Sequence, residues 1–434
     1  MLYHITTLDN FARGYDKYTH SYGKENIPNS HFPEQFFLLK EDEISIGVQK
    51  TQKRLNRTAQ NGNVMIALGA DVSTKDTLND HATGLGQYVP RPRVSLSKVY
   101  WVRTQNNAFS LEETLPEELM THSLALVQKE LVPWQNCRPR SWSVLPIAFA
   151  CQAQCKFCFS KASVSFEHKG HIKDWDAIER SLTAAKKAKA ERAVITGGGE
   201  PTLLKPEDLL KLTKMSSQYL GKTVLITNGA RVETDDANSH SLRELYAAGL
   251  DVLSVSHHHH DSVKAKNILG LDVDIAQLAK LSKAKDTPKL RLICVLQKEG
   301  VASSQDVQDY LSWAAALGIT QVTFKELYVS TTTESAYAGQ EANIYSRDNQ
   351  VPLKSVTDCA QTLGAREVTR LPWGAPVFET TLNGRTIQFV AYTEPSVMWE
   401  RTHGLVRSWN HMSNGATLAS LEDIESKVDV DEFL

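Results

Sequence analysis

Two features are scarce in this sequence: net charge and long apolar runs. Lys and Arg together number 48 and Asp and Glu 50, which leaves a formal net charge of −2. This balance argues against a general nucleic-acid binder or a polybasic membrane binder. No apolar run reaches the roughly 18 residues that a membrane span needs, and the start, MLYHITTLDNFARGYDKY, lacks the apolar core of a signal peptide. We therefore expect a cytoplasmic protein with neither a membrane nor a nucleic acid as its partner.

Cysteine is also scarce, and its distribution is uneven. Three of the six cysteines, Cys151, Cys155 and Cys158, lie in the segment CQAQCKFC, and the others are scattered. A disulfide framework is seldom so uneven in a chain without a secretion signal. The cluster therefore predicts metal binding. A zinc knuckle is the alternative, and it would need a fourth ligand such as His168 or His171.

Apolar runs alternate with helical patterns from about residue 142 onward. Strands are predicted at 145–150, 192–196, 222–227, 251–256, 289–297 and 319–329, and helices at 177–190, 206–220, 241–249, 274–284 and 304–318. This alternation predicts a parallel sheet covered by helices. Polar or glycine-rich segments follow nearly every strand, and the active sites of barrel-like parallel sheets lie at that edge.

The sequence resembles the radical S-adenosylmethionine (radical SAM) superfamily over roughly residues 142–330. The resemblance depends on CQAQCKFC, on Phe157, on GGGEP after the second strand, and on the six βα units. It implies an α/β fold, a partial TIM-like (β/α)6 barrel. It also implies one [4Fe–4S] cluster whose fourth iron binds S-adenosylmethionine (SAM). One electron then cleaves SAM to a 5′-deoxyadenosyl radical, which abstracts hydrogen from the substrate.

The resemblance assigns roles to individual residues. Cys151, Cys155 and Cys158 match the cluster ligands, and Phe157 and Tyr328 match residues near the adenine. Gly198, Gly199 and Glu200 match the motif whose backbone binds the methionine amino group. Asn228 and Ser256 match positions that contact substrate or SAM, although Asn228-Gly229 is equally typical of an ordinary turn.

Further candidates come from the residue types near the predicted rim. Of Lys325 and Glu326, one should face the barrel interior, and we favour Glu326 as a catalytic ligand to substrate. Arg291 is a candidate for an anionic substrate group, with a salt bridge at the barrel bottom as the alternative. His257 or His259, from a run of four histidines, is expected to face the cavity, unless the run is a solvated loop. The remaining candidates are Arg407 and Asn410 as a substrate wall and Cys359 as a hydrogen-atom donor.

Three regions are expected along the chain. Residues 1–140 form an N-terminal α+β extension with a strand at 97–104 and a helix at 112–131. Residues 141–332 form the core. Residues 333–434 form a C-terminal cap with a hairpin at 377–394 and a partly mobile acidic tail. The sequence pattern of the core resembles that of the molybdenum-cofactor GTP cyclase branch. In the C-terminal segment, however, the positions that hold the cysteines of a second cluster in that branch are His403, Val406 and Ser420 here. A single cluster is therefore predicted.

The leading hypothesis is an enzyme that acts on a small or medium-sized substrate by rearrangement, epimerisation, dehydrogenation or cyclisation. It would take electrons from an external donor such as flavodoxin or ferredoxin. One alternative is modification of a peptide or RNA partner recognised by the N-terminal region. The other is an iron–sulfur sensor without catalytic activity.

Overall fold

A computed structural model describes two separate parts of the chain. In the N-terminal unit, the described residues are 2–7, 11, 15–16, 21–23, 36–38, 44, 48, 65–70, 78–79, 87–89, 93–105 and 108–114. In the rest of the chain, they are 131–434 except 169, 173 and 332–334, and the second unit comprises all of these but 352–354. The boundary between the two compact units falls at Lys129 and Glu130.

The described part of the N-terminal unit is made of antiparallel strands. One sheet contains β1 (Leu2–Thr7), β5 (Met65–Ala70), β8 (Arg93–Gln105), β9 (Ala108–Thr114), β3 (Ser21–Gly23) and β2 (Tyr15–Asp16). A second contains β4 (Phe36–Leu38), β7 (Gln87–Val89) and β6 (Leu78–Asn79). The strand predicted at 97–104 is confirmed within β8. The helix predicted at 112–131 is wrong at its start, because 112–114 belong to β9, and residues 115–130 lie outside the described residues.

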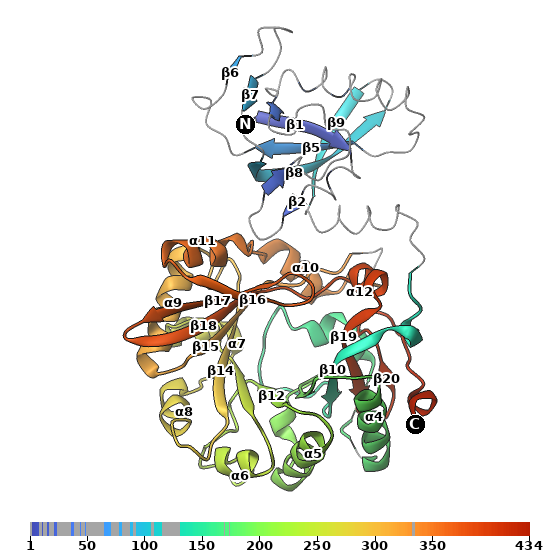
Figure 1. Ribbon diagram of the computed structural model, residues 1–434, viewed down its shortest axis with the longest axis vertical. Helices are drawn as coiled ribbons and strands as arrows, with labels where there is room; N and C mark the ends of the chain where they lie inside the picture. The colour runs from blue at the N-terminus through green and yellow to red at the C-terminus, as the bar shows by residue number, and fades with distance from the viewer. Residues whose placement is uncertain are drawn as a thin grey trace. The chain divides into compact units, whose positions relative to one another are not determined.

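The second unit is built around one large sheet, most of it parallel (Figure 1). Six strands follow one another in chain order: β10 (Arg138–Leu145), β11 (Arg192–Ile195), β12 (Thr223–Thr227), β13 (Val252–Ser256), β14 (Lys289–Val295) and β15 (Gln321–Lys325). All five neighbouring pairs are parallel. The predicted mixed α/β architecture with its parallel sheet is confirmed.

Two further strands extend this sheet at its opposite edges. β18 (Arg385–Tyr392) pairs in parallel with β15, and β19 (Leu405–Met412) pairs in parallel with β10. The eight parallel strands therefore follow the cyclic order of an eight-stranded barrel. The two end strands, β18 and β19, are not paired with each other, so the sheet stays open along one seam. Residues 393–404 connect the two sides of this seam.

The remaining strands are antiparallel additions. β16 (Arg366–Arg370) and β17 (Pro376–Leu382) extend the sheet beyond β18, and β20 (Thr417–Leu418) pairs with β19. The hairpin predicted at 377–394 is confirmed as β17 and β18. Its tip is Asn383-Gly384, whose φ angles of +51° and +70° suit a two-residue hairpin turn.

Helices cover the outside of the sheet (Figure 1). They are α4 (Trp175–Lys187), α5 (Pro206–Tyr219), α6 (Leu242–Ala247), α7 (Ser262–Leu269), α8 (Ile275–Leu281), α9 (Ser304–Leu317), α10 (Glu341–Asn349), α11 (Lys354–Thr362) and α12 (Val397–His403). Sequence signals fix several ends. For example, Ser303 and Asp306 form a capping box at the start of α9, and Gly318 ends it in the left-handed conformation. None of the described helices has the length and apolar character that crossing a membrane requires.

The hydrophobic core lies between the sheet and these helices. Ile178 and Leu182 of α4 and Leu209 and Leu212 of α5 are fully buried, because apolar residues three and four apart form one face of a helix. The inner face of the sheet is different: Ser141 and Ser143 of β10 and Ser408 of β19 point into the barrel. Small polar side chains leave the barrel interior hollow.

The structure bears on two further sequence-based expectations. The first strand was placed at 145–150, but β10 spans Arg138–Leu145 and 146–150 already belong to the following loop. The C-terminal tail, expected to be partly mobile, makes packing contacts: the Phe433 ring lies 4.9 Å from Trp409, and Lys187 of α4 donates a hydrogen bond to the Leu434 carbonyl.

Candidate active site

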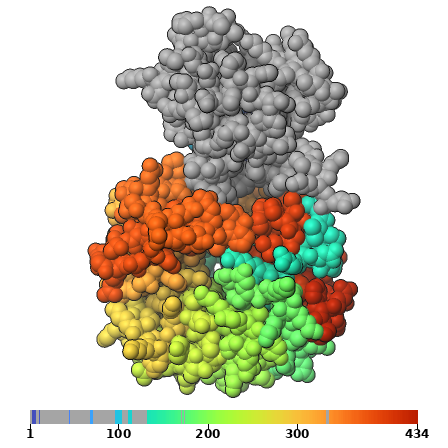
Figure 2. All heavy atoms as spheres, viewed as in Figure 1, coloured from blue at the N-terminus to red at the C-terminus, as the bar shows by residue number. Residues whose placement is uncertain are grey.

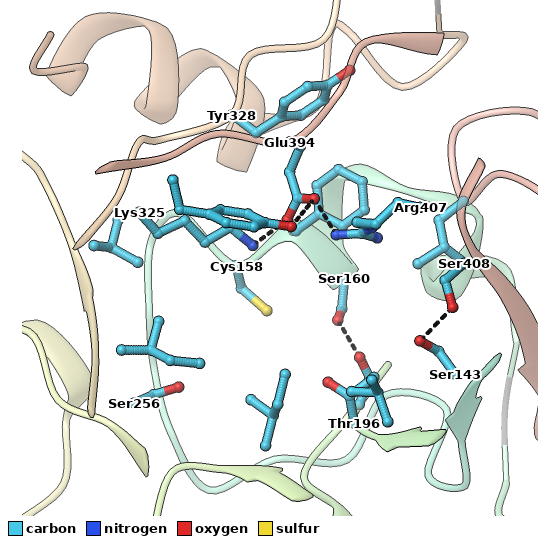
Figure 3. Close-up of a pocket in the computed structure, with 18 of the residues that line it drawn as sticks. Ser143, Cys158, Ser160, Thr196, Ser256, Lys325, Tyr328, Glu394, Arg407 and Ser408 are labelled. Carbon is cyan, nitrogen blue, oxygen red and sulfur yellow. Dashed lines mark hydrogen bonds and ion pairs between the residues drawn. The ribbon is translucent and has the colours of Figure 1, made fainter. Parts of the chain in front are cut away.

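A cavity of about 530 Å³ opens where the parallel strands end. Its lining comes from the cysteine loop, from the inner faces of the strands and from the segment that follows β18. Figure 3 shows Cys158, Ser160 and Ser256 facing the same space. In Figure 2 a hollow is visible between the teal, green and orange segments of this unit. The volume suits a small-molecule ligand.

The three clustered cysteines all line this cavity. They lie on the loop between β10 and the short helical turn Phe159–Ala162, and at least part of each residue is accessible. Cys151 Sγ accepts hydrogen bonds from the Ala153 amide at 3.4 Å and from Asn228 Nδ2 at 3.8 Å. Burial, reinforced by the other two thiols, raises the pKa of Cys155 to about 12. Without bound metal this thiol stays protonated, and iron would displace its proton.

Among the residues that the structure describes, no three His, Cys, Asp or Glu side chains are close enough to hold a single metal ion. The three thiols instead stand around one side of the cavity, on one loop.

The segment Gly197–Glu200 holds the cysteine loop in place. The Gly199 amide donates to the Ile147 carbonyl at 2.7 Å, and the Glu200 amide donates to the Ala150 carbonyl at 2.8 Å. A Cβ atom on Gly199 would lie 2.1 Å from the Ala150 oxygen, so only glycine permits this approach. Gly198 is equally close to the Ala148 oxygen, at 2.0 Å. Gly199 lines the cavity, whereas Gly198 lies behind it.

Glu200 joins the ends of two strands. Its carboxylate accepts hydrogen bonds from the Thr202 amide and hydroxyl, from the Thr227 hydroxyl at 2.6 Å and from the Asn228 amide at 2.9 Å. Burial raises the pKa of this carboxyl, and the four donors oppose that effect. The Glu200 side chain therefore positions the cavity wall, and the predicted cofactor contact of this motif is one of its backbone.

Four other predicted cofactor contacts also line the cavity: Phe157, Asn228, Ser256 and Tyr328. The Asn228 side chain forms a turn, because its Oδ1 accepts from the Ala230 amide at 2.9 Å, and it faces the cavity with its Nδ2. Asn228 thus forms the turn while its side-chain amide faces the cavity, and its contact with SAM or substrate stays a prediction. The Tyr328 hydroxyl donates to Glu422 Oε2 at 2.7 Å.

A charged network crosses the open seam of the barrel. The Glu394 carboxylate, which follows β18, forms ion pairs with Lys325 at the end of β15, at 2.5 Å, and with Arg407 on β19 (Figure 3). Burial alone would raise the pKa of Glu394, but Arg407 and Lys325 lower it to about 2. The Tyr392 hydroxyl donates to the same carboxylate at 3.0 Å. Glu394 is therefore an ionised link between strands on both sides of the seam.

Two more carboxyl groups, Glu400 and Glu422, are buried in the cavity wall. Burial raises the pKa of Glu400 to about 8, although its Oε1 accepts from the Arg407 amide at 2.7 Å. Burial also raises the pKa of Glu422. The sequence-based candidates did not include Glu394, Glu400 or Glu422. Recognising β18 as a parallel strand would have pointed to Glu394, because Glu394 lies just past the strand's C-terminal end.

The remaining candidates divide into two groups. Arg291, Lys325, Glu326, Arg407 and Asn410 line the cavity. His257 and His259 do not line it, and His258 does. Side chains alternate along a strand, so an inward Ser256 carries His258 inward, while His257 stacks on Trp313 with ring centres 5.3 Å apart.

Cys359 also lies away from the cavity. It is buried in α11, and burial raises the pKa of its thiol to about 12. The structure therefore does not place this thiol where it would reach a substrate in the cavity.

The family model of the radical SAM superfamily matches residues 145–295. The chain carries a radical SAM domain. It is an enzyme of the radical SAM type, and the matched segment includes the cysteine loop, Gly197–Glu200, Asn228 and Ser256. The cofactors of such a domain are a [4Fe–4S] cluster and SAM. The resemblance to the molybdenum-cofactor branch stays a prediction.

No curated protein sequence matches this radical SAM enzyme. Among solved structures, it is similar to SuiB of Streptococcus suis bound to the precursor peptide SuiA, with 17% identity, a TM-score of 0.44, and coverage of 76% of this chain and 72% of SuiB. It is also similar to coproporphyrinogen III oxidase HemN from Escherichia coli, with 16% identity, a TM-score of 0.37 and 56% coverage of each chain. A substrate does not follow from similarities this low.

The described residues fit the cofactors of the domain. Three thiols from one loop reach one cavity, which matches three cysteine ligands and an open fourth iron. At Gly199, which lines the cavity, there is no room for a side chain, so backbone atoms form this part of the wall.

Proposed function

We propose that this radical SAM enzyme binds its cluster through Cys151, Cys155 and Cys158 and acts on a small or medium-sized substrate inside the barrel cavity. The observation that supports this best is the convergence of the three cysteines, Gly199, Glu200, Asn228 and Ser256 on one cavity at the carboxyl ends of the parallel strands. When bound, the cluster supplies the electron that cleaves SAM to methionine and a 5′-deoxyadenosyl radical, which removes a hydrogen atom from the substrate.

The chain's own residues position and shield the reactants. Glu200 fixes the ends of β11 and β12 beside the cysteine loop. Phe157, whose ring lies 5.1 Å from His258, lines the cavity together with that histidine. The network of Lys325, Glu394 and Arg407 holds the open seam, where solvent would otherwise enter. Exclusion of water is the contribution that such a cavity makes to radical chemistry.

The decisive experiment is anaerobic reconstitution with iron and sulfide, followed by incubation with SAM and dithionite. We expect about four iron atoms per chain and formation of 5′-deoxyadenosine. Cys155→Ala should reduce this product to background. Cys359→Ala is the matched control, because its thiol is buried in α11 outside the cavity, and this variant should retain the activity.

Two results would contradict the proposal. If the wild-type protein binds iron but forms no 5′-deoxyadenosine, the chain is a non-catalytic iron–sulfur protein. If it binds about eight irons per chain, the single-cluster prediction is wrong. The substrate size class is tested separately, because transfer of deuterium into 5′-deoxyadenosine from a labelled peptide, and not from small molecules, would favour the peptide alternative.

A further inference from the structure

One end of the cavity is lined by arginines. Arg140 of β10, Arg192 at the start of β11 and Arg291 of β14 all contribute to its lining. These positions lie near the beginnings of their strands, whereas the cysteines lie past the opposite ends. Along β11, Arg192 and Thr196 are four residues apart, or about 13 Å in an extended strand. The arginines and the cysteine loop therefore face each other along the length of the barrel interior.

Arg291 has no acidic partner among the described residues. Its Nε donates to the Ser254 hydroxyl at 2.8 Å, and the pKa of the guanidinium falls to about 10 because of burial and the neighbouring Arg192. The salt bridge at the barrel bottom, offered above as the alternative role of Arg291, is therefore not formed. Even a half-buried charge such as this one is seldom left without a counter-charge.

The neighbouring charges do not neutralise this group. Arg140 and Arg192 share one carboxylate, the solvent-exposed Glu191, at 3.4 and 3.1 Å. Lys222 adds a further positive charge beside Arg192 and Arg291, and Asp251 lies near it. Counting Lys289, which also lies near Lys222, five cations accompany two carboxylates in a protein whose formal net charge is −2. Positive charges therefore outnumber negative ones in and around this end of the cavity.

The barrel between the two ends is hollow. Val194, Val224, Ser143 and Thr323 line the cavity between the cysteine loop and the arginines. A ligand can therefore extend from the cysteine loop to the arginines, a distance that equals about four residues of extended peptide. The middle of the cavity therefore has room for the body of a substrate, and the arginines lie where one end of that substrate would be.

We propose that Arg140, Arg192 and Arg291 bind an oxyanion, a carboxylate or phosphate group at the end of the substrate distant from the reacting C–H bond. The assignment rests on the proposed function, since it takes this cavity to be the substrate site. Guanidinium groups pair with such oxyanions through two parallel hydrogen bonds, and Arg291 offers its Nη atoms for this purpose. The substrate class is therefore an elongated organic acid or phosphate ester with one anionic end.

The test measures binding of inorganic phosphate to the full chain by equilibrium dialysis at constant ionic strength, with succinate as competitor. We expect saturable binding to the wild type and a loss of about tenfold or more in Arg291→Met, the size typical of one charged hydrogen-bonding partner. Arg243→Met is the matched control, because Arg243 is an exposed arginine on α6 paired with Asp286 at 3.1 Å. It should bind phosphate as the wild type does.

Removing Arg291 should not unfold the protein, because its loss relieves repulsion from Arg192. Arg291→Met should therefore melt close to the wild-type temperature in the absence of anions, because the relief of repulsion offsets the loss of the hydrogen bond to Ser254. Strong destabilisation would show a structural role and overturn the proposal. Arg192→Met, which alters a side chain that is 31% exposed, provides a second variant and should also weaken phosphate binding.

The other outcomes separate the possibilities. Displacement of phosphate by succinate supports a carboxylate-bearing substrate, and no displacement supports a phosphate-bearing one. No binding of phosphate or succinate, or equal binding by Arg291→Met, overturns the anion site. If that occurs while SAM is still cleaved, the proposed function stands, whereas phosphate binding without SAM cleavage rejects the proposed function instead.

Discussion

The link across the open seam predicts a large effect for Glu394→Gln. The substitution keeps the size of the side chain but removes the negative charge that Lys325 and Arg407 share. Because the carboxylate is mostly buried and both cations are half-buried, the variant leaves Lys325 and Arg407 at the seam without the negative charge that they share. Breaking a buried ion pair from one side typically destabilises a protein by about 3–5 kcal/mol.

The pKa of Glu394 gives an independent estimate of the same effect. The difference between about 2 in the folded protein and the ordinary value of 4.5 corresponds to about 3 kcal/mol of stability at pH 7. A lowered carboxyl pKa stabilises the folded state above pH 4.5, and the stabilisation disappears as the pH falls toward 2. At pH 3, about 1.4 kcal/mol should remain.

The assay is urea unfolding of the wild type and Glu394→Gln at pH 7 and pH 3, followed by tryptophan fluorescence. Seven of the eight tryptophans lie in the second unit, so the signal reports mainly on the barrel. Glu379→Gln is the matched control, because Glu379 pairs with the exposed Arg366 on the neighbouring hairpin at 3.1 Å. It should change the stability far less.

Two results would refute the reasoning. If Glu394→Gln is as stable as Glu379→Gln at pH 7, the seam is not held by this network. If the difference between wild type and Glu394→Gln is the same at pH 7 and pH 3, the carboxylate is not ionised through its two cations.

Two further predictions concern the cysteine loop and a buried acid. Gly199→Ala should lower the iron bound per chain after reconstitution, since its Cβ would lie 2.1 Å from the Ala150 oxygen, whereas Gly221→Ala, with no atom within 4 Å, should bind iron as the wild type does. Equal iron content in both would show that the close approach is unimportant. Because burial raises the pKa of Glu400 to about 8, the folded state keeps a proton that the unfolded chain loses above pH 4.5, and stability falls as the pH rises from 5 to 8. Glu400→Gln, which cannot ionise, should gain more in urea midpoint relative to wild type at pH 8 than at pH 5, and a pH-independent difference would contradict the raised pKa.

The parts of the fold predicted correctly are those with local signals. The strands β11 to β15 are runs of apolar residues followed by glycine or polar turns, and the tip at Asn383-Gly384 has the residues that its turn requires. The strand β10 was misplaced because its inward side chains include Ser141 and Ser143, which make a barrel strand look like a surface segment. A hollow barrel weakens the apolar pattern by which strands are found.

The parts of the site that escaped prediction depend on long-range pairing. The residues of β18 and β19 carry no signal that these strands pair with β15 and β10. The positions of Glu394 and Glu400 in the cavity wall could therefore not be predicted. The histidines show a different limit. Side chains do alternate along this segment, but the prediction did not take Ser256 as the inward-facing residue. It therefore chose His257 or His259 in place of His258, which lines the cavity.

The connection between β18 and β19 has a consequence for the range of substrates. The segment 393–404 leaves the end of one strand and enters the start of the other, and seven of its twelve residues are in α12. With about 1.5 Å per helical residue and 3.3 Å per extended one, it spans at most about 27 Å. A fixed length of backbone thus joins the carboxyl end of β18 to the start of β19 across the seam. Trimming the side chains that line the cavity can enlarge the site without altering this connection, whereas inserting residues into 393–404 would let the two edge strands move further apart.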